Sequence, residues 1–212
     1  MRRPLAVLAA ALALLAAAPA AAEPLRLLAF GDSLVHGYGL AEGKTFPDQL
    51  EAALREAGHA VRVTNAGSSG DTTEAGRSRL DWVVRPRTDA VIVVLGANDA
   101  LRGIDPAVTR RNLDAILGRL TEQDLPTLLA GMKAPRNLGE NYVARFDAIY
   151  PELAEKHGAV FYPFFLKGVA QKPALNQDDG IHPNAEGVRV IVENMLPKVK
   201  KLLARARDAS GS

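Results

Sequence analysis

Three short segments of the chain carry residue types that together could perform nucleophilic catalysis. They are GDSL at residues 31–34, GAND at residues 96–99 and DGIHP at residues 179–183. Their side chains include a serine hydroxyl, a neutral amide and an aspartate–histidine pair. A serine hydroxyl is a weak nucleophile, so it needs a base to take its proton and donors to stabilise the oxyanion that forms. The three segments therefore predict the components of a serine hydrolase.

We expect His182 to be the base of such a site. Asp179 lies three residues earlier, so a tight turn would bring its carboxylate to one imidazole nitrogen and leave the other for Ser33. A helix-entry turn with a capping aspartate is the competing structural interpretation. Two alternatives stay open from the residues alone: His36, three residues after Ser33, is a second candidate base, and Asp178 is a second candidate carboxylate.

The oxyanion would need neutral hydrogen-bond donors. Asn98 has an amide side chain, and Gly70, in NAGSSGDT at residues 65–72, could present its backbone N–H without a side chain in the way. The backbone N–H of Ser33 would be the third donor. Taken singly, Asn98 also fits an Asx turn and Gly70 a turn residue with positive φ.

Alternating strand and helix patterns should position these groups. Five apolar, β-rich runs predict strands at residues 25–30, 61–64, 90–95, 127–131 and 159–162, and four segments predict helices at residues 47–57, 105–122, 142–157 and 185–204. This order predicts an α/β protein, a three-layer α/β/α sandwich with a mostly parallel five-stranded sheet. Ser33, Gly70 and Asn98 each follow a strand, at the edge where open α/β sheets bind ligands.

The N-terminus has the features of a secretory signal peptide. Residues 1–3 are basic at two positions, residues 5–18 are apolar, and three alanines end the segment at Ala22. The apolar run is shorter than the roughly 20 residues that a membrane span needs. We expect cleavage of residues 1–22, export to the periplasm or the medium, a single domain at residues 23–204 and a disordered tail at residues 205–212. An uncleaved anchor is the alternative.

Charge and composition exclude several other classes of protein. Lys plus Arg falls from 26 to 24 when Arg2 and Arg3 are removed, which equals the 24 Asp plus Glu, and no basic run suggests nucleic-acid binding. The sequence has no cysteine, no GxSxG and no HExxH motif. We therefore expect no metal, no cofactor and no integral membrane span in the mature chain. The sequence makes no prediction of oligomeric state.

Four ordered blocks resemble those of the SGNH (GDSL-type) hydrolases. The blocks are FGDSLVHGYGL at 30–40, NAGSSGDTT at 65–73, VLGANDALRG at 94–103 and QDDGIHPNAEG at 177–187. The similarity covers nearly the whole chain after the leader and is greatest to the exported bacterial thioesterase, lysophospholipase and arylesterase branch. The resemblance implies a flavodoxin-like fold and a reaction that needs no cofactor.

The resemblance also implies a role for individual residues. Ser33 would be the nucleophile, Gly70 and Asn98 would be oxyanion donors, and Asp179 and His182 would complete the triad. Gly67 is an alternative position for the glycine of the second block, but the Asp-Thr pair after Gly70 favours Gly70.

The expected substrates are small-molecule or lipid carboxylic esters, and thioesters, with acyl-chain or aryl groups. Apolar loop residues near the sheet edge could line a site for such groups, although ordinary loop packing explains them equally well: Leu101, Ile104, Met132, Pro135, Leu138 and Tyr142. A carbohydrate O-deacetylase with the same triad and a non-catalytic binding module are the alternatives. The single tryptophan, Trp82, is expected to be buried in a helix, which leaves few aromatic side chains for stacking on a sugar.

Overall fold

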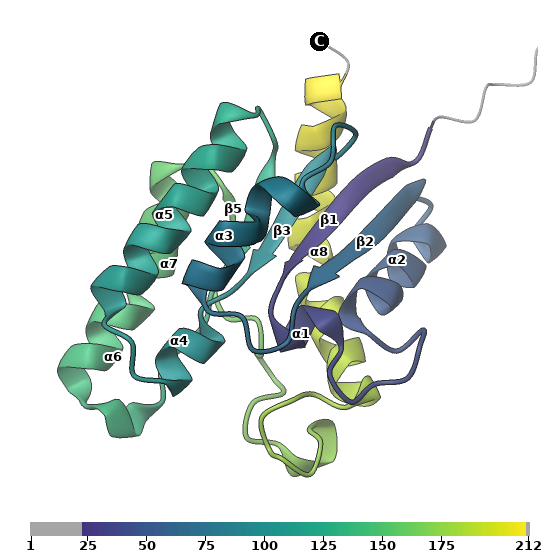
Figure 1. The fold of residues 1–212 in the computed structure, drawn as a ribbon. Helices are drawn as coiled ribbons and strands as arrows, with labels where there is room; N and C mark the ends of the chain where they lie inside the picture. The colour runs from purple at the N-terminus through teal and green to yellow at the C-terminus, as the bar shows by residue number, and fades with distance from the viewer. Residues whose placement is uncertain (1–22, 211–212) are drawn as a thin grey trace, which may run out of the picture.

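A five-stranded parallel sheet forms the centre of the computed structural model, which describes residues 23–210 (Figure 1). The predicted leader lies outside the described residues. The strand order is β2-β1-β3-β4-β5, and every neighbouring pair is parallel. The strands are β1 (Leu25–Gly31), β2 (Val61–Gly67), β3 (Ala90–Val94), β4 (Thr127–Ala130) and β5 (Val160–Tyr162). All five predicted strands are confirmed, with bounds that differ by at most three residues.

The register of the sheet brings together the three strand ends that matter for the candidate site. Gly31 at the end of β1 pairs with Gly67 at the end of β2 and with Val94 at the end of β3. Every residue of β3 is buried, as its continuous apolar sequence predicts for a central parallel strand. The loops that follow β1, β2 and β3 therefore start at one edge of the sheet.

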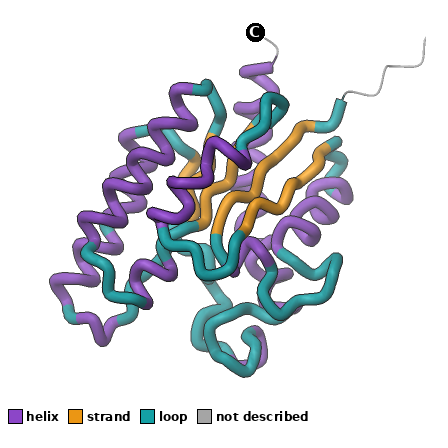
Figure 2. Tube along the Cα trace, in the orientation of Figure 1, coloured by secondary structure: helices purple, strands orange, loops and turns teal. Residues whose placement is uncertain are grey.

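Helices cover both faces of the sheet and complete the predicted three-layer sandwich. The main helices are α2 (Phe46–Glu56), α3 (Thr73–Val83), α5 (Pro106–Glu122), α6 (Glu140–Asp147), α7 (Ile149–Lys156) and α8 (Ala185–Ser210). Helices α3, α5 and α7 lie on one face, and α2 and α8 lie on the other (Figure 1). Short helices α1 (Ser33–His36) and α4 (Ala97–Leu101) and the 3₁₀ turns η1 (Arg136–Leu138) and η2 (Pro173–Leu175) lie in the connections. Figure 2 shows the longer loops gathered at the carboxyl ends of the strands.

Two predicted helix bounds were wrong. The helix predicted at residues 142–157 is two helices, α6 and α7, which meet at Ala148. Pro151 explains the break, because proline has no N–H to donate to the carbonyl of Asp147 and its ring crowds that turn. At the C-terminus, α8 continues through Ser210, so most of the tail predicted as disordered at residues 205–212 is helical.

Helix α3 was not predicted, and the burial of Trp82 was predicted wrongly. Few apolar residues mark this helix, because its buried residues are Thr73, Gly76 and Leu80. Trp82 is 78% exposed. It lies two residues after Leu80, a rotation of about 200° around the helix, which directs the indole away from the sheet.

Candidate active site

Ser33 is presented by a tight turn between β1 and α1. Asp32 caps the helix, since its Oδ1 accepts a hydrogen bond of 3.0 Å from the Leu34 N–H. Gly31 allows the turn, because a Cβ at this position would clash with the Val35 side chain and the Val94 carbonyl. Ser33 is the first residue of α1 and is partly exposed, so its hydroxyl is accessible at the sheet edge.

The hydroxyl of Ser33, the imidazole of His182 and the carboxylate of Asp179 form a continuous chain of hydrogen bonds. His182 Nε2 lies 2.9 Å from Ser33 Oγ, and His182 Nδ1 lies 2.6 Å from Asp179 Oδ2. The other carboxylate oxygen accepts backbone N–H bonds from Ile181 (2.8 Å) and His182 (2.9 Å). The backbone and side-chain bonds from His182, together with that from Ile181, lower the pKa of Asp179 to about 2. The carboxylate is therefore ionised at neutral pH.

Neither alternative acid or base occupies this arrangement. His36 is exposed at the far end of α1, and its backbone carbonyl accepts a bond from the Asn65 side chain. Asp178 is exposed, while its neighbour Asp179 contacts the imidazole. Of the predicted combinations, the structure brings Ser33, His182 and Asp179 together.

Two further residues hold His182 in place, and the sequence reasoning did not single them out. The Tyr38 ring packs on the imidazole, with ring centroids 4.8 Å apart. Gln177 Nε2 donates to the carbonyl of Tyr38 (2.7 Å) and to that of Pro183 (3.0 Å). Gln177 thus joins the loop after α1 to the loop that carries His182. Tyr38 lies in the same sequence block as Ser33, and Gln177 lies in the same block as His182. This closeness in sequence is the signal that could have identified them.

The candidate oxyanion donors lie on the loops after β1, β2 and β3. Gly70 is exposed with φ of 85°, the left-handed conformation that glycine adopts readily. Within residues 23–210, the N–H groups of Ser33 and Gly70 have no recorded acceptor. Gly67, the alternative, donates its N–H to Asn65 Oδ1 at 2.9 Å, so Gly70 is better suited to donate to a ligand.

Asn98 is positioned by the loop after β2, which carries Gly70 and Asp71. Its Nδ2 donates one hydrogen bond, of 3.0 Å, to the carbonyl of Asp71. A primary amide has two such protons, so one remains for a ligand. Arg102 also binds this loop, because its guanidinium donates to the Gly70 carbonyl at 2.9 Å.

Arg79, on α3, connects the loops that carry Ser33 and Gly70. Its guanidinium pairs with Asp71 Oδ2 (2.5 Å) and donates to the carbonyls of Gly31 (2.7 Å) and Ala66 (2.9 Å). It also lies 4.6 Å from the centre of the Phe30 ring. The sequence reasoning missed Arg79 because its partners are up to 48 residues away along the chain and α3 itself was not recognised.

A buried polar network joins α4 to the start of α3. Asp99, which follows Asn98, accepts bonds from the Thr73 N–H (2.8 Å), the Thr73 hydroxyl (2.5 Å) and the Thr109 hydroxyl (3.1 Å). Asn112 donates to the Thr73 hydroxyl at 3.2 Å. Because these groups are buried and bonded to one another, they fix the Asn98 helix relative to the Gly70 loop.

The carboxyl of Asp32 is the unusual group of the site. It is fully buried directly behind Ser33, and its Oδ2 has no hydrogen-bond partner within the described residues. Burial raises the pKa of this carboxyl to about 7, and the neighbouring carboxylates of Asp71 and Asp99 add to the effect, while the bond from Leu34 opposes it.

The residues predicted to line a substrate groove occupy different environments. Leu101 is 54% exposed, whereas Met132 is buried in the core. Tyr142 is half-buried and donates its hydroxyl to the Ile104 carbonyl at 2.7 Å. Pro135 and Leu138 are half-buried beside and within the 3₁₀ turn η1. Their role in substrate binding stays a prediction.

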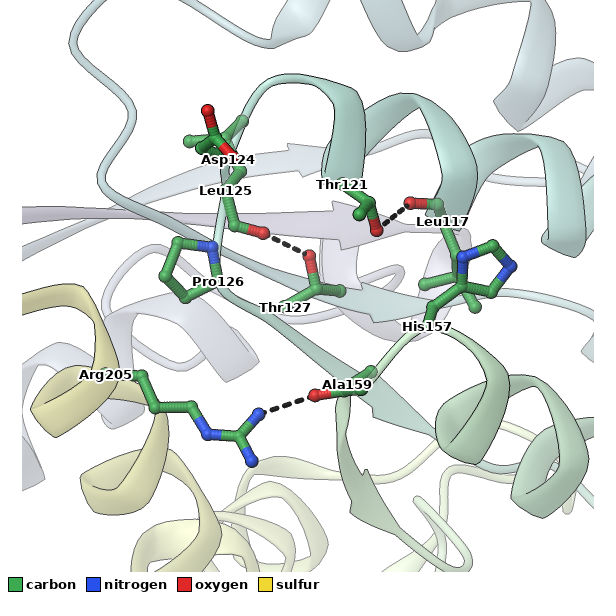
Figure 3. Close-up of a pocket in the computed structure, with 10 residues that line it drawn as sticks. Leu117, Thr121, Asp124, Leu125, Pro126, Thr127, His157, Ala159 and Arg205 are labelled. Atoms are coloured by element: carbon green, nitrogen blue, oxygen red, sulfur yellow. Dashed lines mark hydrogen bonds between the residues drawn. The ribbon is translucent and has the colours of Figure 1, made fainter. Parts of the chain in front are cut away.

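A second aspartate–histidine pair lies away from Ser33. His157 Nε2 is 2.6 Å from Asp114 Oδ1, and the imidazole lines a cavity of about 240 Å³ (Figure 3). The two hydroxyls in this cavity are engaged, because Thr121 donates to the Leu117 carbonyl and Thr127 to that of Leu125 (Figure 3). Neither hydroxyl is therefore free to act as a nucleophile for His157, whereas the Ser33 hydroxyl is bonded directly to His182.

Within residues 23–210, no group of three or more His, Asp or Glu side chains is arranged to hold a metal ion. No helix of that part of the chain combines the length and apolar character needed to cross a membrane.

Comparisons with known proteins agree with this geometry. Residues 29–190 match the GDSL-like lipase/acylhydrolase family. An arylesterase of Vibrio mimicus is 39% identical over 190 residues, which cover 89% of this chain and 94% of that protein. Thioesterase 1/protease 1/lysophospholipase L1 of Escherichia coli K12 is 36% identical over 193 residues, covering 91% of this chain and 90% of that protein.

A solved structure leads to the same assignment. The crystal structure of AlinE4, an SGNH-hydrolase family esterase, superimposes with a TM-score of 0.73 and 49% identity, covering 87% of this chain and 99% of that one. The fold, the ordered sequence blocks and these relatives all agree with the resemblance seen in the sequence. The chain belongs to the GDSL-like lipase/acylhydrolase family and is a hydrolase that acts on ester bonds.

Proposed function

We propose that the protein is a serine esterase that hydrolyses carboxylic esters, and thioesters, of acyl-chain or aryl substrates through Ser33, His182 and Asp179. The chain of hydrogen bonds from Ser33 Oγ through both nitrogens of His182 to Asp179 is the observation that carries this proposal. The ionised Asp179 would fix the imidazole tautomer and stabilise the imidazolium that forms.

The proposed reaction has two stages. Ser33 Oγ attacks the ester carbonyl while His182 Nε2 takes its proton, and the oxyanion accepts hydrogen bonds from the N–H groups of Ser33 and Gly70 and from Asn98. The tetrahedral intermediate collapses, and the leaving alcohol or thiol takes the proton from His182. A water molecule then attacks the acyl-enzyme with His182 again acting as base, which releases the acid and restores Ser33.

The apolar residues around the site and the names of the relatives support the proposed substrate class. Leu101, Ile181 and Tyr38 are large, exposed and apolar, and each lies within a few residues of a proposed catalytic group. Burying acyl or aryl surface against them would contribute about 25 cal/mol per Å². The relatives named arylesterase and lysophospholipase support the same class.

We further propose that the enzyme acts after export. The signal peptide predicted at residues 1–22 is the reason for this proposal.

The carbohydrate O-deacetylase alternative gains little from the exposed Trp82. Trp82 lies near the C-terminus of α3, at the opposite end of the sheet from Ser33. An indole in that place cannot stack on a sugar whose ester is held at Ser33.

Hydrolysis of p-nitrophenyl esters from acetate to palmitate tests the proposal. We expect the rate to rise with acyl length to an optimum, and Ser33→Ala or His182→Ala to lower kcat by several orders of magnitude. Asn98→Ala should cost about 100-fold as an oxyanion donor is lost. Activity confined to acetate would favour deacetylation, and equal rates in wild type and Ser33→Ala would refute the proposed nucleophile.

His36→Ala serves as the matched control for the base. It removes an exposed imidazole three residues from Ser33 and should leave kcat within about twofold of wild type, because His36 is not bonded to the hydroxyl. A severe loss in this variant with a mild loss in His182→Ala would overturn the assignment of the base.

A further inference from the structure

A basic groove lies at the amino ends of β1 and β2, at the opposite end of the sheet from Ser33. It has a volume of about 450 Å³ and is lined by the first residues of both strands and by the loop between α3 and β3. Four arginines surround it: Arg26, Arg62, Arg85 and Arg87. In Figure 1 no helix lies in front of β2 and the upper part of β1, and the side chains of Arg26, Arg62 and Thr64 are exposed.

The arginines of this groove differ from most arginines of the protein in having no partner. Within residues 23–210, five guanidinium groups have no recorded hydrogen bond or ion pair, and the fifth belongs to Arg111 on α5. Four of the five thus gather around one groove. Asp89 accepts a hydrogen bond from the Arg26 backbone N–H and not from its guanidinium.

An exposed tryptophan lies next to the same groove. Trp82 precedes Val83, which is part of the groove lining, and it is 78% exposed, more than any other large hydrophobic side chain among the described residues. Tryptophan combines a large apolar ring with a polar N–H, so it is enriched at interfaces where one end is apolar and the other is wet. A partner that suits both the arginines and Trp82 would be anionic and would also bury an indole ring.

We infer that this groove and Trp82 together dock the protein on a bilayer surface that carries anionic phospholipid headgroups. Guanidinium groups pair with headgroup phosphates in a bidentate fashion. Tryptophan concentrates at the boundary between headgroups and acyl chains, where its ring is buried and its N–H stays wet. A small free anion would satisfy the charges but not the indole, and a nucleic acid would favour a longer basic stripe than this compact cluster.

Trp82 also makes the inference testable, because it is the only tryptophan in the chain. Its fluorescence reports on this surface alone. We expect its emission to shift to the blue with vesicles of phosphatidylcholine containing about 30% phosphatidylglycerol, and not with pure phosphatidylcholine. About 0.5 M salt should reverse most of the shift, since the Debye length then falls to roughly 4 Å. Cosedimentation with the same vesicles provides the binding constant.

The double variant Arg62→Gln/Arg85→Gln should weaken vesicle binding about 25-fold, because each arginine near such a surface contributes about fivefold. The matched control is Arg111→Gln, which removes an exposed arginine of α5 that does not line the groove and should leave binding within about twofold. All three side chains are exposed and unbonded, so the variants should fold normally. The double variant should keep wild-type hydrolysis of a soluble p-nitrophenyl ester.

Several results would overturn the inference. They are no shift with anionic vesicles, an equal shift with neutral vesicles, or an equal loss of binding in Arg111→Gln. A shift produced by inorganic phosphate or glycerol phosphate alone would indicate a small-anion site, and one produced by duplex DNA but not by vesicles would indicate a nucleic-acid surface. None of these readouts needs ester hydrolysis, and all can be repeated in Ser33→Ala, so the docking inference and the proposed function fail separately.

Discussion

The buried carboxyl of Asp32 predicts an unusual dependence of stability on pH. Its pKa is about 7 in the folded protein, raised by burial, compared with 3.8 for an ordinary aspartate. Between these values the unfolded chain has lost the proton and the folded protein has kept it. Stability must therefore fall as pH rises from about 4 to about 7 and become constant above that. Asp32→Asn removes the titration and keeps an oxygen that can accept the Leu34 N–H.

The size of the effect follows from the pKa shift. Each unit of pH corresponds to about 1.4 kcal/mol for one proton, so the wild type should lose about 3 kcal/mol between pH 5 and pH 8 through this group. At pH 5 Asp32 is protonated and resembles asparagine in shape and charge, so the two proteins should be similar. At pH 8 the variant should be more stable than the wild type by about 3 kcal/mol more than at pH 5.

Urea unfolding of both proteins at pH 5, 6, 7 and 8 measures this difference directly. Asp105→Asn is the control, because Asp105 also caps a helix, accepting the Ala107 N–H at 2.9 Å, but is exposed. That backbone bond lowers the pKa of Asp105, so its substitution should add no pH dependence in this range. If the gain from Asp32→Asn stays constant within about 0.5 kcal/mol from pH 5 to 8, the carboxyl is already ionised in the folded protein and the reasoning is wrong.

Three other substitutions test the site and its support. Asp179→Asn should lower kcat/KM by about three to four orders of magnitude at neutral pH with little change in the melting temperature, because it disturbs the His182 tautomer; a loss below tenfold would contradict the role of Asp179. Arg79→Met should cost about 3 kcal/mol in urea unfolding because it leaves Asp71 unpaired, whereas the exposed Arg119→Met should cost under about 1 kcal/mol. Gly96→Ala should destabilise the protein by about 2–3 kcal/mol, since its Cβ would collide with the Tyr150 hydroxyl at a positive φ. Gly103→Ala, with positive φ but open space, should cost about 1 kcal/mol, and equal losses would show that the collision is relieved.

The strands and the meeting of Ser33, His182 and Asp179 could be predicted from the sequence because both have local patterns. A continuous apolar run such as Val91 to Leu95 indicates a buried parallel strand, and polar groups directly after such runs must meet at one sheet edge. The Asp179–His182 pair needs one turn only. Ser33 and His182 are 149 residues apart, but each lies in a recognisable block, so the family resemblance supplied what local reasoning could not.

The supporting residues could not be predicted in this way. Arg79 owes its position to partners on two other segments and to a helix whose buried face contains a threonine and a glycine in place of apolar residues. Because the helix was not recognised, the exposed position of Trp82 was not predicted either. Had α3 been placed, the spacing of Trp82 from Leu80 would have put the indole on the solvent side.

The position of Arg26 and Ser33 at opposite ends of β1 separates the two surfaces discussed above. From Arg26 to Gly31 the strand spans five residues at about 3.3 Å each, or about 17 Å, and Ser33 lies beyond that end. A bilayer docked at the arginines would leave Ser33, His182 and the exposed apolar side chains around them facing away from it. The proposed docking would therefore hold the enzyme at a surface while the site stays open to esters that diffuse in solution. The two surfaces share no side chain, but α3 contributes to both, through Arg79 at the site and through Val83 and Trp82 at the groove.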